Sequence, residues 1–276
     1  MAGEFDAWLG RTEEVEDCVT IGQARRMAAT LDIDNFPFSD GAPLPPLWHW
    51  MAWTPDAPMS RIGPDGHTRR GDFWPPVPLE RRMWAGGRLT FHSSPKIGEK
   101  LVRRSEITKI ASKTGGAGEM VFVTVLHEIR AKGEIAITEE QDIVYIAMPE
   151  RFAPPPPTPV PEAIWEEPVA IDPVRLFRFS AVTFNGHRIH YDLPYAQEVE
   201  KYPGLVVHGP FQAVLLMEAA RRHRGDAVPR RFKFRGVRPL FHFDPARIVA
   251  AAEADGSQVL CTATSDYQCM QGEVTW

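Results

Sequence analysis

The stretch Phe179-Ser180-Ala181-Val182-Thr183-Phe184-Asn185-Gly186-His187-Arg188-Ile189-His190-Tyr191-Asp192 is followed, about one helix later, by Gly204-Leu205-Val206-Val207-His208-Gly209-Pro210. The first segment packs an amide, two imidazoles and a carboxylate closely together, and the second places a Gly-Pro break ahead of an apolar segment. Pro210 to His223 is predicted to be a helix, because proline is favoured in a first turn and apolar residues recur along one stripe. Polar groups gathered beside a helix start indicate chemistry rather than packing.

Strand patterns follow this helix to the end of the chain. Arg231, Lys233 and Arg235 alternate with Phe232, Phe234 and Gly236, which places the cations on one face and the aromatic rings on the other. Further strand-like runs occupy 239–243, 247–254, 259–265 and 272–276, and Asp255-Gly256 is a typical hairpin turn. The second half therefore predicts one central helix followed by four or five antiparallel strands.

The first half repeats this plan less regularly. Residues 12 to 31 are predicted as a helix that Thr20 can cap, and a Pro-rich passage from 36 to 98 excludes long helices. Within it, 47–53 is long enough for a short apolar helix or strand, whose tryptophans either belong to the core or line a pocket. Val-, Ile- and Thr-rich runs at 100–112, 120–130 and 135–146, separated by Gly-bearing turns at 114–118 and 132–133, predict an antiparallel meander. The predicted fold class is α+β, with a curved antiparallel sheet around a central helix present twice.

A Pro-rich segment separates the two halves. Pro154 to Pro157 and Pro159 favour an extended polyproline conformation and exclude a helix or an inner strand. We expect an N-terminal domain at 1–150, a linker at 151–173 and a C-terminal domain at 174–276.

The composition excludes several classes of protein. Hydrophobic residues form 43% and charged residues 24% of the 276-residue chain, as in ordinary globular proteins. A net charge of -5 argues against a nucleic-acid partner. Cys18, Cys261 and Cys269 show no CxxC spacing, so neither a disulfide framework nor a thiolate zinc site is expected. The N-terminal residues lack the pattern of a secretion signal and no run is long enough to cross a membrane, so we expect a cytoplasmic protein without a membrane partner.

The histidines of the opening stretch allow three interpretations. His187, His190 and Asp192 carry proper ligand groups for a first-row metal, but their spacing matches no specific zinc signature. They can also be turn residues whose polar groups are satisfied by the backbone. The interpretation that we favour is acid–base catalysis by a histidine, because the ordinary pKa of histidine, near 6.5, suits proton transfer at neutral pH.

Two further features are candidates for binding a substrate. Backbone N–H groups at the start of a helix have no partner within the helix, so the Gly209 N–H can stabilise a developing oxyanion, although an ordinary helix start is an equal alternative. Arg231, Lys233 and Arg235 can bind the phosphates of a nucleotide-bearing carrier, or they can form a solvated charged face.

Together these residues resemble a known family. The motif from Phe179 to Asp192, then Tyr195-Ala196 and Pro203 to Pro210, is similar to that of the MaoC-like (R)-specific enoyl-thioester hydratases and dehydratases. The resemblance is closest to their double-hotdog branch, which includes the mitochondrial type 2 3-hydroxyacyl-thioester dehydratase and bacterial itaconyl-CoA and mesaconyl-C4-CoA hydratases. Arg81 to Gly87, Phe91-His92 and Gly98-Glu99 agree with the N-terminal half of that branch. The resemblance therefore covers nearly the whole chain.

The resemblance implies a double hotdog fold, in which the N-terminal domain holds a substrate pocket with a degenerate site and the C-terminal domain is catalytic. The family uses an Asp and a His five positions apart, and here Asn185 and His190 stand at those positions, with His187 at an intervening Asn position. An amide cannot exchange a proton as a carboxylate can. We therefore expect His190 to be the general base and acid, Asn185 to orient the water, and Gly209 to donate its N–H to the thioester oxygen; the roles of His187 and Asp192 stay open.

The expected reaction is the reversible hydration of a 2-enoyl-CoA with a short, branched or dicarboxylic acyl group, without a metal or other cofactor. The substrate partner is then an acyl-CoA, and a homo-oligomer is compatible with the sequence. Three alternatives remain open: a dehydratase acting on acyl-carrier-protein thioesters, a hotdog protein that binds acyl-CoA without turnover, and a thioesterase.

Overall fold

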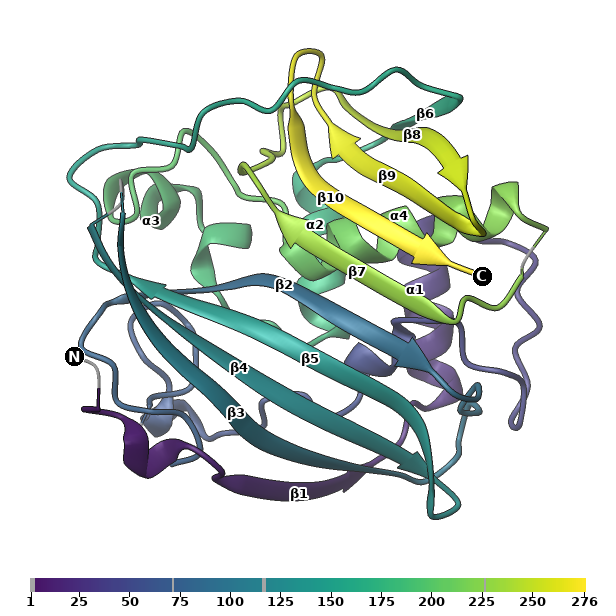
Figure 1. The fold of residues 1–276 in the computed structure, drawn as a ribbon, viewed down its shortest axis with the longest axis horizontal. Helices are drawn as coiled ribbons and strands as arrows, with labels where there is room; N and C mark the ends of the chain where they lie inside the picture. The colour runs from purple at the N-terminus through teal and green to yellow at the C-terminus, as the bar shows by residue number, and fades with distance from the viewer. Residues whose placement is uncertain (1–2, 71, 116–117, 226) are drawn as a thin grey trace.

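A computed structural model describes residues 3–70, 72–115, 118–225 and 227–276, and a single ten-stranded antiparallel sheet forms its frame (Figure 1). The strand order is β1-β3-β4-β5-β2-β7-β10-β9-β8-β6, so each half of the chain contributes one side of the sheet. The strands are β1 (Thr12–Asp17), β2 (Arg81–Phe91), β3 (Leu101–Gly115), β4 (Gly118–Ala131), β5 (Glu134–Ile146), β6 (Trp165–Val169), β7 (Arg231–Gly236), β8 (Ala246–Ala254), β9 (Ser257–Ala263) and β10 (Gln268–Thr275).

The predicted meander is confirmed, because β3, β4 and β5 pair in sequence order and antiparallel. Lys132 and Gly133 join β4 to β5 with φ of 53° and 87°, and Asp255 and Gly256 join β8 to β9 with φ of 50° and 72°. A two-residue turn with positive φ at both central residues has a backbone twist that matches the right-handed twist of the flanking strands. The predicted turn at Gly116 and Ala117 lies outside the described residues.

The two halves meet where β2 pairs with β7. Gly86 lies opposite Arg235, and a Cβ on Gly86 would lie 2.5 Å from the Phe234 carbonyl oxygen, so a larger residue there would push the strands apart. A β-bulge between Trp84 and Gly86 also shifts the register of β2 against β5. Bulges of this kind bend a strand and re-aim its side chains.

The helices pack on one side of this sheet (Figure 1). They are α1 (Ile21–Leu31), α2 (Pro173–Val182), α3 (Leu193–Glu198) and α4 (Gly209–His223), with 3-10 turns η1 (Asp6–Trp8), η2 (Trp48–Met51), η3 (Met59–Arg61) and η4 (Arg188–His190). The helix predicted from Pro210 to His223 is confirmed as α4. Every residue from Phe211 to Ala220 is buried, since α4 fills the interior of the second half.

Three predictions for single elements were wrong in part. Residues 12–17 form edge strand β1 rather than helix, and α1 begins only after Thr20, whose side chain caps it through a capping box with Gln23. Residues 239–243 contribute an isolated bridge between Phe241 and Val206 instead of a strand. The segment expected to be a linker contains edge strand β6, which pairs with β8. Proline is tolerated there because one side of an edge strand needs no backbone donor.

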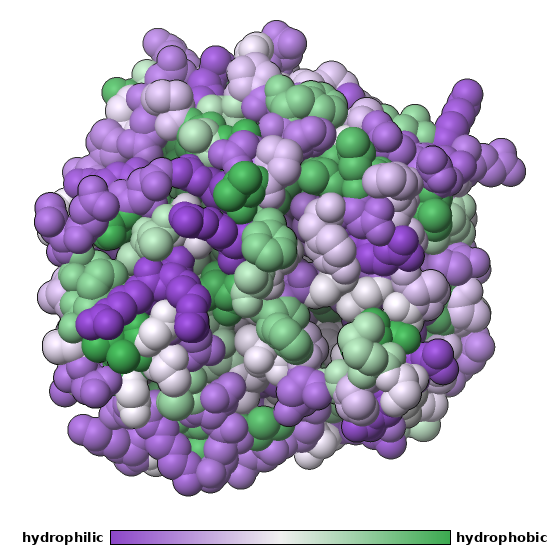
Figure 2. Space-filling view, turned by 180° about the vertical axis from the view of Figure 1, so that it is seen from behind, coloured by the Kyte–Doolittle hydropathy of each residue, from purple (hydrophilic) through white to green (hydrophobic). Residues whose placement is uncertain are grey.

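Both interpretations of the tryptophan-rich segment are confirmed, for different residues. Trp48 is fully buried and donates its indole N–H to Glu218 of α4 at 2.9 Å, whereas Trp50 and Trp53 line a cavity. Seen from behind the view of Figure 1, the surface of the molecule mixes hydrophilic and hydrophobic residues (Figure 2). Within the described part of the chain, no helix has the length and apolar character to cross a membrane.

Candidate active site

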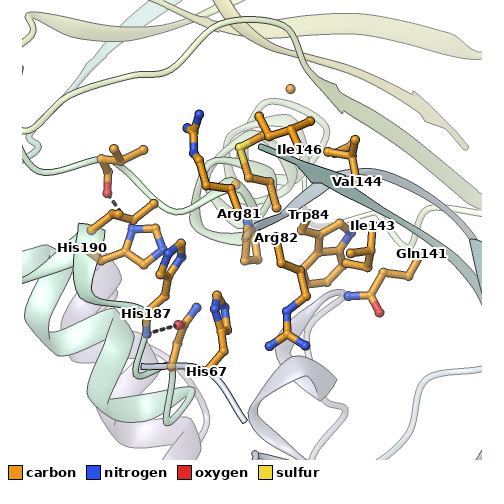
Figure 3. A pocket seen from close by; sticks show the side chains of 18 of the residues that line it. His67, Arg81, Arg82, Trp84, Gln141, Ile143, Val144, Ile146, His187 and His190 are labelled. Carbon is orange, nitrogen blue, oxygen red and sulfur yellow. Dashed lines mark hydrogen bonds between the residues drawn. The ribbon is translucent and has the colours of Figure 1, made fainter. Parts of the chain in front are cut away.

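A cavity of about 1960 Å³ lies between the two halves (Figure 3). The first half lines it with residues of β2, β4, β5 and the loop around His67. The second half contributes Asn185, His187, His190, Val206, Val207, Gly209, Pro210 and parts of β7 and β10. The cavity therefore brings together residues that are more than a hundred positions apart in the sequence.

The motif loop follows α2 and turns sharply back toward the cavity. Phe184 has φ of 50°, and the Asn185 N–H donates to the Ser180 carbonyl at 2.8 Å, which closes the turn after the helix. Turn η4 then carries Arg188 to His190. This path places Asn185, His187 and His190 on the cavity wall.

His190 has the geometry of a general base. Its side chain is buried, and Nδ1 lies 2.7 Å from the Val206 carbonyl oxygen. A carbonyl can only accept, so Nδ1 carries the ring hydrogen and Nε2 keeps its lone pair. Burial, followed by the neighbouring rings of His208 and His187, lowers the pKa of His190 well below 6.5. The imidazole is therefore neutral and ready to accept a proton at neutral pH.

His208 supports the ring of His190 from behind. The two rings stack with centroids 3.6 Å apart, and His208 Nε2 lies 2.8 Å from the Ser180 hydroxyl. His208 is fully buried, and burial lowers its pKa to about 3, with a smaller contribution from His187. A neutral ring in this place holds His190 in position without adding a charge beside it.

Gly209 opens helix α4 at the cavity wall. It is the first residue of the helix, so its N–H has no acceptor within the helix, and Pro210 has no N–H at all. A Cβ at Gly209 would make ordinary contacts, 3.5 Å from the Trp84 carbonyl oxygen and 3.8 Å from Met270 Cε, so space alone does not require glycine at this position. The N–H also lies at the positive end of the helix dipole, which favours a developing negative charge.

Asn185 and His187 belong to one hydrogen-bonded chain. The Asn185 side-chain oxygen accepts the His187 backbone N–H at 3.0 Å, which leaves the amide NH2 group to donate elsewhere. His187 Nε2 lies 3.0 Å from Glu200 Oε1, and Arg81 Nε donates to Glu200 Oε2 at 3.1 Å. The side chains of His187, Glu200 and Arg81 are nearly buried, with exposures of 8%, 2% and 9%. Buried charges are tolerated when they are paired in this way.

Asp65 and His67, which the sequence did not predict, are added to the site by the first half. His67 Nδ1 lies 2.9 Å from Asp65 Oδ2, and the His67 ring lies 4.2 Å from the ring of His187. Burial and then the charge of Arg82 lower the pKa of His67 to about 3. Burial alone would raise the pKa of Asp65, but the hydrogen bond and charge of His67 hold it below its usual value.

Gly66 fixes this loop against the motif loop. It has φ of 89°, and a Cβ there would lie 1.8 Å from the Gly186 carbonyl oxygen, so the two backbones are in direct contact. The Arg188 N–H donates to the Asp65 carbonyl at 2.9 Å. The sequence signal was Pro64-Asp65-Gly66, an ordinary turn pattern that says nothing about what the turn touches.

The predicted metal candidates His187, His190 and Asp192 do not converge, because Asp192 lies off the cavity. A different group, Asp65, His67 and His187, has ligand atoms within 4.8 Å of one another. All three of its members are already paired, His67 with Asp65 and His187 with Glu200. The charge of Arg82 beside His67 also disfavours a cation there.

Asp192 stabilises the start of helix α3. Asp192 caps α3 by accepting the Tyr195 N–H at 3.1 Å, and its second oxygen accepts from Arg188 at 2.7 Å. The side-chain bond from Arg188 and the backbone bond from Tyr195 lower the pKa of Asp192. Asp192 is not among the residues that line the cavity, so its carboxylate has no place to act directly on a substrate there.

The basic strip has the predicted alternation, with Phe232 and Phe234 buried and Arg231, Lys233 and Arg235 exposed. Of these three cations, only Arg235 lines the cavity. Lys233 lies 3.6 Å from Glu273 on the outer face of the sheet. Arg231 and Lys233 share the exposed face of β7 with Arg235 but do not line the cavity, so the cavity does not support a phosphate site formed by all three residues.

The first half has its own buried polar cluster in the same cavity. His49 Nε2 lies 3.0 Å from Glu139 Oε2, and the Trp50 indole N–H donates to Glu139 Oε1 at 3.0 Å. Burial alone would raise the pKa of Glu139, but the hydrogen bond and charge of His49 hold it below its usual value. In this cluster the histidine is bound to a carboxylate rather than left free to act as a base.

Comparisons with known proteins agree with this picture. The sequence model of the hydroxyacyl-thioester dehydratase type 2 family matches residues 47–242. A mesaconyl-C(4)-CoA hydratase from Chloroflexus aurantiacus is 48% identical over 260 residues, which cover 92% of this chain and 91% of that protein. The resemblance noted in the sequence therefore extends to a relative of nearly the same length.

Solved structures confirm the fold. A MaoC-like dehydratase from Phytophthora capsici superposes with a TM-score of 0.71 at 11% identity, covering 97% of this chain and 95% of that chain. A Mycobacterium tuberculosis protein with a double hotdog fold superposes with a TM-score of 0.60 at 12% identity, covering 96% and 95%. The expected α+β double hotdog is therefore confirmed.

Proposed function

The chain belongs to the hydroxyacyl-thioester dehydratase type 2 family, and from that membership we propose that it is a hydro-lyase that reversibly hydrates a 2-enoyl-CoA thioester. One observation carries the proposal: His190, with Nδ1 bound to a backbone carbonyl and Nε2 unprotonated, lines the same cavity as the helix-start N–H of Gly209. A base and an oxyanion donor in one cavity are the two groups that water addition to an enoyl thioester requires.

The proposed chemistry balances with one water molecule. Nε2 of His190 takes a proton from water while the water oxygen bonds to the β-carbon. The π electrons of the double bond move to the thioester oxygen, and the Gly209 N–H stabilises the resulting enolate. The His190 imidazolium then gives its proton to the α-carbon and the thioester carbonyl re-forms. No electrons enter or leave, so the reaction as proposed needs no redox cofactor.

Asn185 is proposed to orient the water. Because its oxygen is held by the His187 N–H, its NH2 group is the part that can donate a hydrogen bond. A donor to the water oxygen and an acceptor for the water proton together fix the direction of attack. This arrangement gives one proton-transferring histidine in place of an Asp–His pair.

The substrate is proposed to be a branched dicarboxylic acyl-CoA of the kind named for the Chloroflexus relative. Mesaconic acid is a methyl-branched unsaturated dicarboxylic acid, and its thioester at C4 keeps a free carboxylate on the β-carbon. For the carrier, Arg235 and Arg238 line the cavity beside the Pro154 to Pro156 segment, where the Arg238 guanidinium donates to the Pro155 carbonyl. These cations are suited to the phosphates of coenzyme A.

The test is loss of the enoyl-thioester absorbance when purified protein is mixed with mesaconyl-C4-CoA, itaconyl-CoA or crotonyl-CoA. We expect hydration of at least one of these, fastest with mesaconyl-C4-CoA. Binding of every thioester without absorbance loss would replace the proposal by an acyl-CoA-binding protein.

A second candidate is a dehydratase of acyl-carrier-protein thioesters, because the name of the matching family specifies a hydroxyacyl thioester without naming its carrier. Parallel assays of crotonyl-CoA and of crotonyl groups on acyl carrier protein separate the two. A large preference for the carrier protein would support this second function.

A further inference from the structure

Two neighbouring arginines of β2 lie in different environments. Arg81 is neutralised, since it donates to Glu200 and to the Tyr202 hydroxyl and lies over the Tyr202 ring. Arg82 lines the cavity too, yet among the described residues no carboxylate lies within salt-bridge distance of its guanidinium. Figure 3 shows the two side chains leaving the strand in opposite directions, with Arg82 extending toward His67.

Strand geometry places Arg82 on an apolar inner face. Arg82 lies directly opposite Tyr145 in the β2–β5 ladder, and Trp84, two residues on, lies opposite Ile143. Residues two apart share a face. Tyr145 and Ile143 belong to a buried apolar cluster with Val121 and Val123 of β4, so Arg82 carries a charge into the hydrophobic side of the cavity.

The other polar groups near Arg82 do not supply a counter-charge. The Tyr145 hydroxyl beside it is neutral, because burial raises the pKa of that phenol. Arg70 is a second cation on the same side and donates to the carbonyls of Leu79 and Glu80 at 2.6 and 2.8 Å. His67 is neutral, and the Asp65 carboxylate is bound to His67. A half-buried guanidinium without an anion is costly unless a ligand supplies one.

We propose that Arg82 binds the free carboxylate of the acyl group and thereby selects dicarboxylic enoyl-CoA substrates. A guanidinium presents paired N–H donors that match the two oxygens of a carboxylate. The apolar surroundings formed by Trp84 and Ile143 strengthen that ion pair and leave room for a short, branched carbon skeleton. The carboxylate then lies in the first half, and the thioester faces Gly209 in the second half. The double bond between these two groups therefore lies across the cavity beside His190.

This inference rests on the proposed hydratase function, and its test separates the two. The variants are Arg82→Met, which removes the charge, and Arg82→Lys, which keeps the charge but loses the paired donors. The matched control is Arg88→Met on the same strand, because Arg88 pairs with Glu140 and Asp142 on the exposed outer face. Each is assayed with mesaconyl-C4-CoA and with crotonyl-CoA, which lacks the carboxylate.

We expect Arg82→Met to lose roughly 100-fold in kcat/KM for mesaconyl-C4-CoA and less than about threefold for crotonyl-CoA, since only the dicarboxylic substrate makes a charge-assisted, paired hydrogen bond with the guanidinium. Arg82→Lys is expected to show a smaller loss with the same selectivity, and Arg88→Met none. Equal losses on both substrates, or none on mesaconyl-C4-CoA, would overturn the carboxylate site and leave the hydratase standing. If the wild-type protein hydrates neither substrate, the proposed function fails and this inference fails with it.

A binding measurement provides a readout that does not depend on turnover. Succinyl-CoA carries its carboxylate on the same carbon as mesaconyl-C4-CoA but has no double bond, and butyryl-CoA has a methyl group there. Calorimetry is expected to show succinyl-CoA bound more tightly than butyryl-CoA by the wild-type protein, and a loss of that difference in Arg82→Met. A difference that survives in Arg82→Met would place the carboxylate elsewhere.

Discussion

The two halves of the sheet share a strand plan but enclose different interiors. In the second half, the fifteen-residue helix α4 fills the space behind the strands, and its first residue provides a backbone donor. In the first half, the corresponding segment makes only the four-residue turn η2 (Trp48–Met51), and much of the space stays open as cavity. The comparison teaches that the second half fills its interior with a helix while the first half leaves open space, which under the proposed function is where the acyl chain would lie.

The histidines of the two halves show the same division. His49 of the first half is hydrogen-bonded to Glu139, while His190 of the second half has, among the described residues, one hydrogen-bond partner, the Val206 carbonyl at Nδ1. The two histidines therefore differ in their partners: Nε2 of His49 is held by a buried carboxylate, and Nδ1 of His190 is held by a backbone carbonyl. Substitutions in each half can test that difference.

Replacing His190 by alanine should have the largest effect. We expect kcat for the best enoyl-CoA to fall by roughly 10³-fold, since removal of a general base typically costs 10²–10⁴-fold. His49→Ala should instead lower the free energy of unfolding by about 3–5 kcal/mol, because it leaves Glu139 buried without its partner, and should change kcat less than about tenfold. Steady-state kinetics and urea unfolding on both variants measure this, and a larger kinetic loss in His49→Ala would reverse the roles of the halves.

Gly66→Ala should have the next largest effect, because it acts at the contact between the halves. The added Cβ would meet the Gly186 carbonyl oxygen, so the loop carrying His67 must move away from Asn185 and His187. A misplacement of about 1 Å in a catalytic site can cost about 100-fold, and we expect a loss in kcat/KM of that order.

The matched control is Gly133→Ala, which has a similar φ of 87° but no atom within 4 Å of the new Cβ. This variant should lose about 1–3 kcal/mol of stability from backbone strain alone, and its kinetics should not change. If both variants kept full activity, the contact between the loops would not matter for catalysis.

Acid should destabilise both halves through buried neutral histidines. Burial lowers the pKa of His127 in the first half to about 4 and of His208 in the second to about 3. The unfolded chain, with a histidine pKa near 6.5, binds protons that the folded chain excludes, so stability is complete above pH 6.5 and is lost as the pH falls toward 4. For each histidine, stability should fall by about 1.4 kcal/mol for every pH unit in this range.

Urea unfolding at several pH values measures this dependence. His127→Gln and His208→Gln should each flatten the fall in stability between pH 6.5 and 4, because glutamine does not titrate. A slope that changes in only one of the two variants would show that the acid sensitivity belongs to one half.

The sequence predicted the regular elements well because their signals are local. Hairpin turns such as Asp255-Gly256, the Thr20 cap and the Pro210 helix start each depend on a few neighbouring residues. The strand from Thr12 to Asp17 was missed because an exposed edge strand rich in Glu has no apolar alternation, and the helical period of α1 was extended back through it.

The sequence predicted only those residues of the site that belong to one motif. His190, Asn185, His187 and Gly209 lie together on the cavity wall as the motif indicated. Asp65 and His67 were not predicted, because a loop more than a hundred residues away reaches the motif only through tertiary contacts such as the one between Gly66 and Gly186. The difference between Arg81 and Arg82 was also hidden, since adjacent residues of a strand look equal in sequence and face opposite environments in the fold.

Asn185→Asp should have the smallest effect, and it tests whether the second half works with a neutral amide. The carboxylate can still accept the His187 N–H, so the loop should keep its shape. A negative charge near His190 favours the protonated ring, which raises its pKa from the lowered value. Because catalysis needs the neutral ring, the acidic limb of the kcat/KM profile, which lies below pH 6.5 in the wild-type protein, should move to higher pH.

The size of the accompanying rate change distinguishes two roles for Asn185. If its NH2 group holds the water, the aspartate variant loses that donor and kcat should fall by up to about tenfold, since a neutral hydrogen bond contributes about 0.5–1.5 kcal/mol. If kcat instead rises, a second proton-transferring group was missing from the wild-type site, and His190 alone is not sufficient. An unchanged rate and profile would mean that Asn185 only shapes the loop, and the water would then be held by another donor on the cavity wall.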